Sequence, residues 1–253
     1  MFYFTDFYGK KILKSTLLNE IEHFFTTKEF MLTEGELPEK SHEAQENRRF
    51  LCDKLSVPIE SIKTAKQIHS ANIEIVCENI NIYENCDALV SSIENSLMLL
   101  NFADCVPIIL FDNKNNIASV VHAGWRGTTN KIAQESVEVM KEKFNSKPEN
   151  IKAAIGPSIG ECCFAVDENV YSQLVKSSLT KDIDKIYRYD SHCDKYYIDL
   201  KNLNKIQLLD KGLFEIDVCG YCTSCMSDIF FSYRKENGKT ARHSAVVKLG
   251  KRR

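Results

Sequence analysis

Apolar residues form two kinds of pattern along the chain, and the denser kind lies in its centre. Between Ser96 and Ala123 the segments SLMLLNFA, VPIILFD and IASVVHA are almost wholly apolar, with short polar breaks between them. Uninterrupted apolar runs of this length predict strands that are buried on both faces. IKAAIG and FEIDVCG predict further strands, and the alternation over Ile73–Cys77 predicts another. A sheet at the centre of the core is therefore expected.

Helical periodicity replaces these runs in the flanking segments. Apolar residues recur every three or four positions from Asn130 to Phe144, which places them on one face of a helix. Residues 40–56 predict a helix with Ser41 as its N-cap, and another helix is expected after Asp167. Residues 199–211 predict a helix with an aspartate N-cap and a glycine stop. Helices and strands alternate without the regular repeat of a doubly wound fold, which predicts the α+β class.

The two ends of the chain are predicted to add strands. Residues 1–30 are expected to form a strand, a loop and a second strand at HFFTTKEF. The segment FFSYRKENGKTARHSAVVKL is expected to form a hairpin that turns at 236–238, with His243 as a surface residue without an assigned role. No linker or repeat interrupts the chain, so residues 1–253 are expected to form a single domain.

Charge and composition exclude several classes of protein. The 33 Lys+Arg residues are balanced by 35 Asp+Glu residues, which argues against a nucleic-acid-binding protein. No apolar run approaches the ~18 residues of a membrane span, and the N-terminus lacks the residue order of a secretory signal. We therefore expect a cytoplasmic protein, a monomer or weak homodimer, with mostly reduced cysteines among its ten.

Three residues at predicted element ends could bind a metal ion. His69 precedes a strand, Cys105 lies at the break between two buried runs, and His122 ends a strand ahead of a glycine-containing turn. Two imidazoles and one thiolate make a three-ligand set of the kind found in catalytic zinc sites, where a fourth position stays open. Because the three residues are far apart in the chain, a core cysteine and two ordinary histidines remain the alternative.

Longer motifs around these residues resemble the YfiH-like family. They are NFADCVPIILFD, ASVVHAGWRGTTNKIA, AAIGPSIGECCFAV and FFSYRKENGKTAR, and the resemblance extends from about His23 to Lys248. The family has been called laccase-domain or polyphenol oxidase, and more recently purine nucleoside phosphorylase; the human protein FAMIN belongs to it. The resemblance implies a single-domain, four-layer α-β-β-α sandwich that binds zinc and acts on purine nucleosides in the cytoplasm.

The resemblance also implies roles for individual residues. The metal ligands of the family correspond to His69, Cys105 and His122 in this chain. The family's substrate or phosphate contacts correspond to Asn47, Arg48 and Gln67. One departure stands out near the N-terminus, where Thr27-Lys28-Glu29 replaces the Arg-Gly-Gly that is usual in the family. If this segment shapes the pocket, substrate preference should differ.

Residue chemistry adds candidates for handling phosphate and protons. The guanidinium groups of Arg48 and Arg126 match the geometry of a phosphate, and Arg126 stands directly ahead of a helix start. Asp104 could orient a metal ligand or transfer a proton, although a turn aspartate is an equal alternative. Trp125 could stack on a base, but packing against the neighbouring helix is the stronger interpretation.

Phosphorolysis of a purine nucleoside is the reaction that these assignments predict. Arginines would hold phosphate as the nucleophile, and zinc would take a substrate oxygen or a water at its open position. The products would be a purine base and ribose-1-phosphate. The resemblance implies adenosine, inosine, guanosine or methylthioadenosine as substrates, with adenosine deamination as a second activity. The preferred nucleoside stays open.

Two other functions remain as alternatives. Six histidines without a His-x-His pair argue against a four-copper laccase, but a single copper bound by His-Cys-His would support polyphenol oxidation. Some bacterial members of the family are discussed in connection with peptidoglycan fidelity. A hydrolase that edits a cell-wall precursor is therefore the other alternative.

Two further cysteine motifs have a role that the sequence leaves open. Cys219, Cys222 and Cys225 make a C-x-x-C-x-x-C pattern, which is compatible with an iron–sulfur cluster, a redox pair, a second zinc site or simply buried thiols. The adjacent Cys162 and Cys163 are expected to lie in an extended segment, to point apart and to be structural.

The segment GPSIG matches the G-x-S-x-G pattern of a nucleophile elbow. Such an elbow requires a helix directly after the turn, whereas the sequence predicts an extended segment there. Pro157 also restricts the backbone immediately before the serine. We therefore expect Ser158 to have no nucleophilic role.

Overall fold

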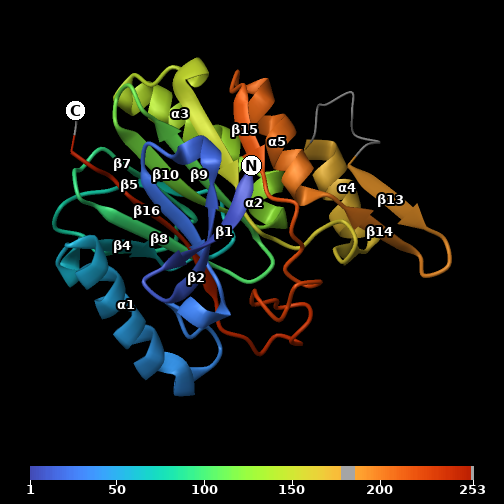
Figure 1. The fold of residues 1–253 in the computed structure, drawn as a ribbon. Helices are drawn as coiled ribbons and strands as arrows, with labels where there is room; N and C mark the ends of the chain where they lie inside the picture. The colour runs from blue at the N-terminus through green and yellow to red at the C-terminus, as the bar shows by residue number, and fades with distance from the viewer. Residues whose placement is uncertain (178–185, 252–253) are drawn as a thin grey trace.

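Two large β-sheets form the centre of the computed structural model, which describes residues 1–177 and 186–251 (Figure 1). The seven-stranded sheet contains, in spatial order, β1 (Phe2–Phe7), β2 (Lys10–Ser15), β3 (Glu22–Thr26), β16 (His243–Lys248), β8 (Leu97–Phe102), β4 (Ile62–Ala65) and β6 (Ile82–Tyr83). The six-stranded sheet contains β15 (Glu215–Val218), β11 (Ile151–Ile155), β9 (Val106–Asp112), β10 (Ile117–Ala123), β7 (Ala88–Ser91) and β5 (Ile73–Ile75). A small third sheet has the order β12 (Ala165–Val166), β14 (Lys195–Ile198) and β13 (Tyr187–Asp190).

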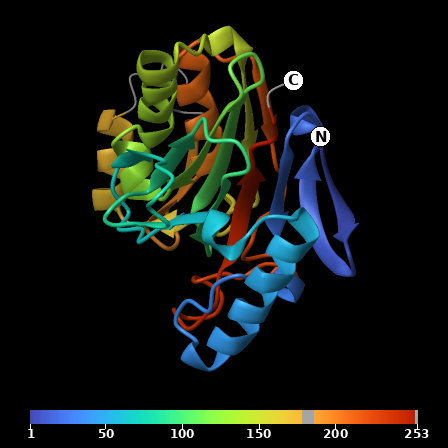
Figure 2. The ribbon, with the colours of Figure 1, turned by 90° about the vertical axis from the view of Figure 1, so that its left-hand side faces the viewer.

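Helices cover the outer faces of the two large sheets. The helices are α1 (Ser41–Leu55), α2 (Trp125–Thr129), α3 (Ile132–Phe144), α4 (Glu168–Ser177) and α5 (Leu200–Asp210). Single turns of 3-10 helix occur at Thr16–Leu18, Lys28–Phe30, Pro38–Lys40, Ile59–Ser61 and Pro148–Asn150. In Figure 2, α1 and α3 lie on opposite sides of the molecule with the sheets between them. The predicted four-layer α-β-β-α sandwich of the α+β class is therefore confirmed.

Three apolar clusters separate the layers. Phe25, Leu100 and Val120 belong to the cluster between the sheets, which explains why the central strands are apolar on both faces. A second cluster lies under α1 and includes Leu51. The third lies under α3 and α5 and includes Val137. Burial on this scale stabilises the fold by roughly 1.5–3 kcal/mol for each large apolar side chain.

The predicted central strands and helices are found close to their expected bounds. β9 pairs with β10 in an antiparallel register that places Ile108 opposite Val121. The Asp199 carboxylate accepts a hydrogen bond from the Asn202 N–H at the start of α5, as an N-cap does. Helix α1 differs in one detail, because Ser41 is its first residue and Lys40 stands at the N-cap without a side-chain bond.

The predicted ends of the chain need two corrections. Residues 1–30 contain three strands, because β1 and β2 form a hairpin at Tyr8 and Gly9, both of which have positive φ angles. In the described part of this segment the expected hairpin is not found: residues 233–238 form turns, Arg242 makes an isolated bridge to Thr33, and β16 is the strand that follows. β16 finds its partners elsewhere, between β3 and β8. His243 is consequently fully buried rather than on the surface, and burial lowers its pKa to about 3.

Within the described residues, no helix has the length and apolar character needed to cross a membrane. The chain's last two residues, Arg252 and Arg253, lie outside the described residues.

Candidate active site

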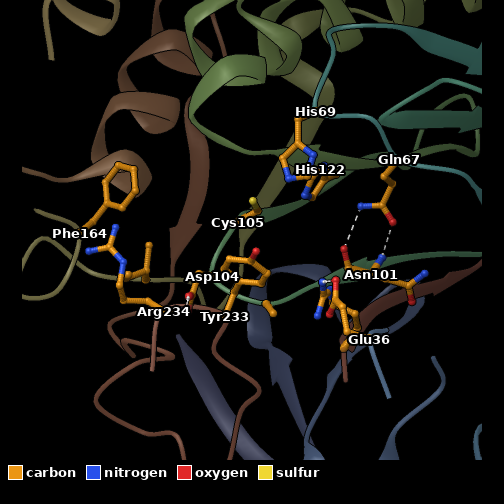
Figure 3. Close-up of a pocket in the computed structure, with 13 residues that line it drawn as sticks. Glu36, Gln67, His69, Asn101, Asp104, Cys105, His122, Phe164, Tyr233 and Arg234 are labelled. Carbon is orange, nitrogen blue, oxygen red and sulfur yellow. Dashed lines mark hydrogen bonds and ion pairs between the residues drawn. The ribbon is translucent and has the colours of Figure 1, made fainter. Parts of the chain in front are cut away.

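The three predicted metal ligands converge although they come from three different elements. His69 lies in the loop after β4, Cys105 lies in the turn that joins β8 to β9, and His122 lies in β10. One donor atom from each lies within 4.8 Å of the other two. Figure 3 shows both imidazoles and the Cys105 sulfur at one end of a cavity. The turn that carries Cys105 crosses from the seven-stranded sheet to the six-stranded sheet, so the site lies at their junction.

Gly124, directly after β10, provides the space for these side chains to meet. A Cβ atom at this position would lie 3.1 Å from the Cys105 sulfur and 3.1 Å from His69 Cδ2. Both separations are tighter than ordinary van der Waals contact. Gly124 is therefore required by the close approach of Cys105 and His69, two of the predicted metal ligands.

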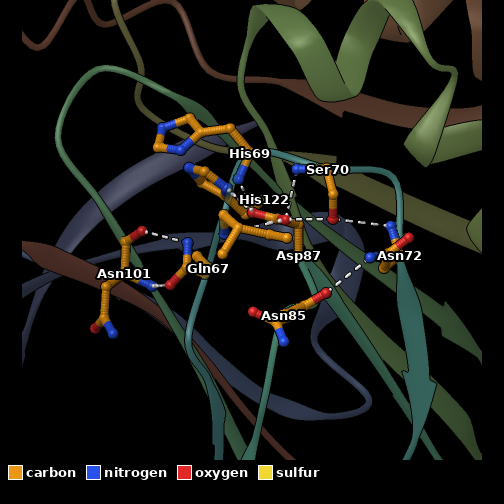
Figure 4. Close-up of polar contacts among 9 residues, drawn as sticks. Gln67, His69, Ser70, Asn72, Asn85, Asp87, Asn101 and His122 are labelled. Carbon is orange, nitrogen blue, oxygen red and sulfur yellow. Dashed lines mark hydrogen bonds and ion pairs between the residues drawn. The ribbon is translucent and has the colours of Figure 1, made fainter.

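Asp87 holds two of the three ligands in place, as Figure 4 shows. Its fully buried carboxylate lies 2.8 Å from His122 Nδ1 and accepts the backbone N–H of His69 at 3.0 Å. The same carboxylate accepts the N–H and the hydroxyl of Ser70, each at 2.7 Å. Because Nδ1 of His122 faces a carboxylate, Nδ1 keeps a proton, so Nε2 is the nitrogen that a metal ion would bind. Burial would lower the pKa of His122, but Cys105 and Asp87 raise it to about 9, so an ion must displace the proton from Nε2.

The protonation states suit metal binding. Burial alone would raise the pKa of the Cys105 thiol, but His122 and His69 lower it to about 6, so the thiolate predominates at neutral pH. Burial likewise opposes ionisation of Asp87, yet hydrogen bonds from His122 and Ser70 lower its pKa to about 2. A thiolate, an imidazole held by a carboxylate and a second imidazole make a donor set that fits zinc or copper.

A cavity of about 560 Å³ adjoins the three ligands. This volume lies within the ~300–1,000 Å³ of ordinary small-molecule sites. The cavity is lined by Glu36, Gln67, His69, Asn101, Ala103, Asp104, Cys105, His122, Ile159, Phe164, Tyr233, Arg234 and Arg242. Two arginines, two histidines and two aromatic rings on one cavity can bind a ligand that combines an anion with a planar ring.

Asp104 connects the metal-binding turn to the far wall of the cavity. One carboxylate oxygen accepts the hydroxyl of Thr223 at 2.6 Å, and the other accepts the backbone N–H of Arg234 at 2.7 Å. The residue has a positive φ of 83°, which places it in the sharp turn just before Cys105. Since both oxygens already accept hydrogen bonds, the geometry favours a positioning role over proton transfer.

The cavity loop, which we define as residues 231–242, supplies Tyr233, Arg234 and Arg242. The Glu236 carboxylate anchors it through Lys28, Thr240 and the backbone N–H of Ser232. Lys28 belongs to the segment Thr27-Lys28-Glu29, so this segment contacts the cavity loop through the ion pair with Glu236.

The remaining predicted site residues are divided between the cavity and its surroundings. Gln67 lines the cavity, where its amide donates to the Asn101 carbonyl at 2.8 Å and accepts the Asn101 N–H at 2.9 Å. Asn47, Arg48 and Arg126 are described residues that do not line it. Their roles as phosphate or substrate contacts stay predictions.

Each of those three residues has a different environment. Asn47 donates to the Met31 carbonyl at 2.8 Å, and the Arg48 guanidinium donates to the Leu32 carbonyl at 2.6 Å. Arg126 is exposed, and its guanidinium lies 4.3 Å from the centre of the Trp125 ring. Trp125 itself packs against the cluster under α3 and α5, in agreement with the stronger sequence interpretation.

Sequence reasoning missed several residues of the site. Asp87 directly precedes the apolar run of β7, a position that resembles an ordinary turn aspartate. Arg234 and Arg242 lie in FFSYRKENGKTAR, a motif that carried the resemblance without being assigned a role. Ser158 is fully buried and does not line the cavity, which agrees with the expectation that it is no nucleophile.

Comparison with known proteins gives consistent matches. Residues 32–250 match the model of the family described as multi-copper polyphenol oxidoreductase laccase. Purine nucleoside phosphorylase YlmD of Bacillus subtilis is 31% identical over 220 residues, which cover 83% of this chain and 78% of that protein. Adenosine deaminase RL5 from an unknown prokaryotic organism is 31% identical over 199 residues, covering 74% and 75%. The crystal structure of YlmD from Geobacillus stearothermophilus superimposes with a TM-score of 0.88 at 28% identity, covering 98% and 99%.

Proposed function

This chain belongs to the multi-copper polyphenol oxidoreductase laccase family, and from that membership and the geometry of its site we propose that it is a metal-dependent purine nucleoside phosphorylase. One observation carries the proposal: His69, Cys105 and His122 converge at the end of a cavity that also contains two arginines. Relatives named purine nucleoside phosphorylase support the choice of substrate. We propose zinc as the ion, because two imidazoles and one thiolate are an ordinary zinc set with one open position.

Bound in this position, zinc would act as a Lewis acid toward an oxygen atom of the substrate. The protein's own residues orient the metal ligands and bind the substrate. Asp87 orients His122 and the His69 backbone, so the donor set is arranged before an ion arrives. The Phe164 and Tyr233 rings line the cavity and offer apolar faces to a purine.

Phosphate is the nucleophile in the proposed reaction. A phosphate oxygen forms a bond to C1′ of the ribose while the bond from C1′ to the purine nitrogen breaks. The purine leaves with the electron pair and takes up a proton, and ribose-1-phosphate remains. Arg234 and Arg242 line this cavity, where Arg242 forms an ion pair with Glu36. We propose that the two arginines hold the phosphate, which would take the place of Glu36 at Arg242, with the predicted contributions of Arg48 and Arg126.

Adenosine deamination is the second candidate function. It is favoured by the similarity to a relative named adenosine deaminase. The same cavity would serve, with water in place of phosphate. Oxidation of polyphenols with copper and editing of a cell-wall precursor remain as outcomes that a product assay would detect.

Product analysis tests these functions directly. Reduced protein of measured metal content is incubated with adenosine, with and without phosphate, and the products are separated by chromatography. We expect adenine and ribose-1-phosphate only with phosphate, and inosine in both conditions if deamination also occurs. Neither product from protein that holds a metal ion would overturn the proposal and favour the alternatives.

Two variants link the products to the site. Cys105→Ser should lose turnover together with the ion of the His-Cys-His site, whereas Cys77→Ser should lose neither, because Cys77 is an exposed thiol outside the site. Normal turnover in Cys105→Ser protein that has lost this ion would exclude the metal mechanism. We also propose a reducing compartment such as the cytoplasm for the reaction, since Cys105 must remain a thiolate.

A further inference from the structure

A second cluster of thiols lies near the active-site cavity. Cys162 and Cys163 come from a turn after β11, and Cys222 and Cys225 come from the turns after β15. The four sulfur atoms all lie within 4.8 Å of one another. The expectation that Cys162 and Cys163 point apart in an extended segment is therefore wrong. Cys219 is not a member of the cluster, so the C-x-x-C-x-x-C motif contributes only two of its three thiols.

Sheet topology brings the two cysteine pairs together. β11 and β15 are neighbouring parallel strands, with Ile155 opposite Val218. The carboxyl ends of parallel strands meet at one edge of the sheet, so the turns that follow them become neighbours. The association continues past the strands, where Ser158 bridges to Cys222 and its carbonyl accepts the Thr223 N–H at 3.0 Å. Regular backbone pairing thus sets the position of the cluster.

The separations between sulfur atoms fit a shared metal ion better than a disulfide. The Cys225 sulfur lies 3.6 Å from the Cys162 sulfur and 3.5 Å from the Cys163 sulfur. Bonded sulfur atoms would be about 2.05 Å apart. Four sulfur atoms around a tetrahedral zinc, with bonds of about 2.3 Å, would be about 3.8 Å apart. Both Cys225 distances are close to that value, and no two of the four sulfur atoms are more than 4.8 Å apart.

The surroundings favour a thiolate at Cys222 and leave space for the cluster. The Gly160 N–H donates to the Cys222 sulfur at 3.1 Å, as backbone amides do toward charged sulfur. A Cβ atom at Gly160 would lie 3.2 Å from the Cys162 sulfur and 3.2 Å from Cys222 Cβ. Cys222 and Cys225 also have the C-x-x-C spacing that is typical of structural zinc sites.

We propose that Cys162, Cys163, Cys222 and Cys225 bind a structural zinc ion that is separate from the His-Cys-His site. Four thiolates close the coordination sphere, so this ion would have no position for a substrate. Its effect on the active site passes through two contacts: Thr223 donates to Asp104, and the Arg234 guanidinium donates to the Cys163 carbonyl at 3.1 Å. The ion fixes the turns that support both residues at the cavity.

Zinc counting tests the proposal on the full-length protein. Wild-type protein is purified under reducing conditions, loaded with zinc, desalted and analysed by mass spectrometry for zinc per chain. We expect two zinc ions in the wild type, one in Cys105→Ser, one in Cys225→Ser and two in Cys77→Ser. Cys77 is the matched control, because its thiol is exposed and belongs to neither cluster.

Cobalt provides a measurement that does not require the Cys225 variant to fold. Cys105→Ser protein, which lacks the thiolate of the first site, should still bind one cobalt ion with the strong thiolate-to-cobalt absorption of a four-sulfur site. Wild-type protein that saturates at one ion, with that ion lost in Cys105→Ser, would overturn the proposal. A disulfide found among the four cysteines of reduced protein would overturn it as well.

Discussion

Asp87 joins His69 and His122, two of the predicted metal ligands, through one buried carboxylate. Replacing it with asparagine keeps the size of the side chain but removes the charge that fixes the His122 tautomer. We expect Asp87→Asn to weaken metal binding by about 10- to 100-fold, the usual effect of losing such a partner. Competition with a chelator of known affinity measures the change.

A second buried carboxylate provides the control for this substitution. Asp112 is also fully buried, but it accepts hydrogen bonds from the Lys114 and Asn115 backbone at a turn outside the cavity. Asp112→Asn should reduce stability and leave metal affinity unchanged. Equal metal affinity in wild-type and Asp87→Asn protein would show that the carboxylate does not tune the site.

A substitution at Gly124 tests how tightly the predicted metal ligands are packed. In Gly124→Ala, the added methyl group would lie 3.1 Å from the Cys105 sulfur and must displace it or His69. Overpacking of this kind costs about 1–3 kcal/mol, which corresponds to a loss of roughly 5- to 150-fold in metal affinity. Gly250→Ala is the control, because among the described residues other than its chain neighbours no atom lies within 4 Å of its Cβ position. Full metal affinity in Gly124→Ala would contradict the close packing.

The sequence predicted these three ligands mainly through the family resemblance of longer motifs. His69, Cys105 and His122 are far apart in the chain, and spacing alone could not distinguish them from core residues. Asp87 and Arg234 could not be found from local patterns at all. Their partners are brought to them by strand pairing, as in the contact between Asp104 and the Arg234 backbone.

At the scale of elements, the Glu236 carboxylate is one of the anchors of the cavity loop. In Glu236→Gln, the charge that faces Lys28 is lost, and the loop that carries Tyr233 and Arg234 should become less ordered. We expect kcat/KM to fall about tenfold, corresponding to ~1.4 kcal/mol, with metal content unchanged. Steady-state kinetics and metal analysis of the same sample measure both effects.

An exposed glutamate on α3 serves as the comparison for that variant. Glu142→Gln removes the same charge far from the cavity loop and should leave kcat/KM unchanged. If Glu236→Gln retains full activity, the ion pair with Lys28 has no part in ordering the cavity.

Elements with strong internal patterns were predictable, and those that depend on distant partners were not. The buried runs of β8, β9 and β10 and the apolar stripe of α3 are properties of the local sequence. The cavity loop has the glycine turn of a hairpin at Gly238, yet its conformation is set by Lys28 and by Asp104. Tertiary contacts therefore override the local hairpin preference.

The whole molecule should lose stability in mild acid because of a buried histidine. His23 is fully buried, with its Nε2 accepting the Ser15 N–H at 3.1 Å and its Nδ1 3.0 Å from the Ile21 carbonyl. This arrangement requires the neutral ring, and burial lowers its pKa from 6.5 to about 4. The unfolded chain therefore binds a proton near pH 6.5 that the folded chain does not.

This difference in proton binding determines whether stability rises or falls with pH. The contribution of neutral His23 to the free energy of unfolding is fully present above pH 6.5 and decreases as the pH falls toward 4. Between pH 7.5 and pH 5 the loss from His23 is about 2 kcal/mol. Urea unfolding of wild-type and His23→Gln protein at both pH values measures it. The variant should be less stable at pH 7.5 and should show a smaller loss on acidification. Equal losses in the two proteins would exclude His23 as a cause.

The arrangement of the two sheets could be predicted from family resemblance but not from periodicity. The alternation of apolar and polar residues identifies which segments are strands, whereas their order within a sheet depends on pairings between remote segments. The C-terminal strand β16 illustrates this point, because it inserts between β3 and β8 near the middle of the seven-stranded sheet.

The position of the metal ligands at the junction of the two sheets has an evolutionary consequence. Cys105 lies where the chain leaves one sheet for the other, and His122 lies in the six-stranded sheet. A substitution such as Val120→Ala, in the layer between the sheets, would shift the ligands relative to one another by altering the packing. Selection for coordination geometry should therefore restrict drift in that layer. The layer under α1, which does not set the ligand separation, should accept substitutions more freely among descendants of this chain.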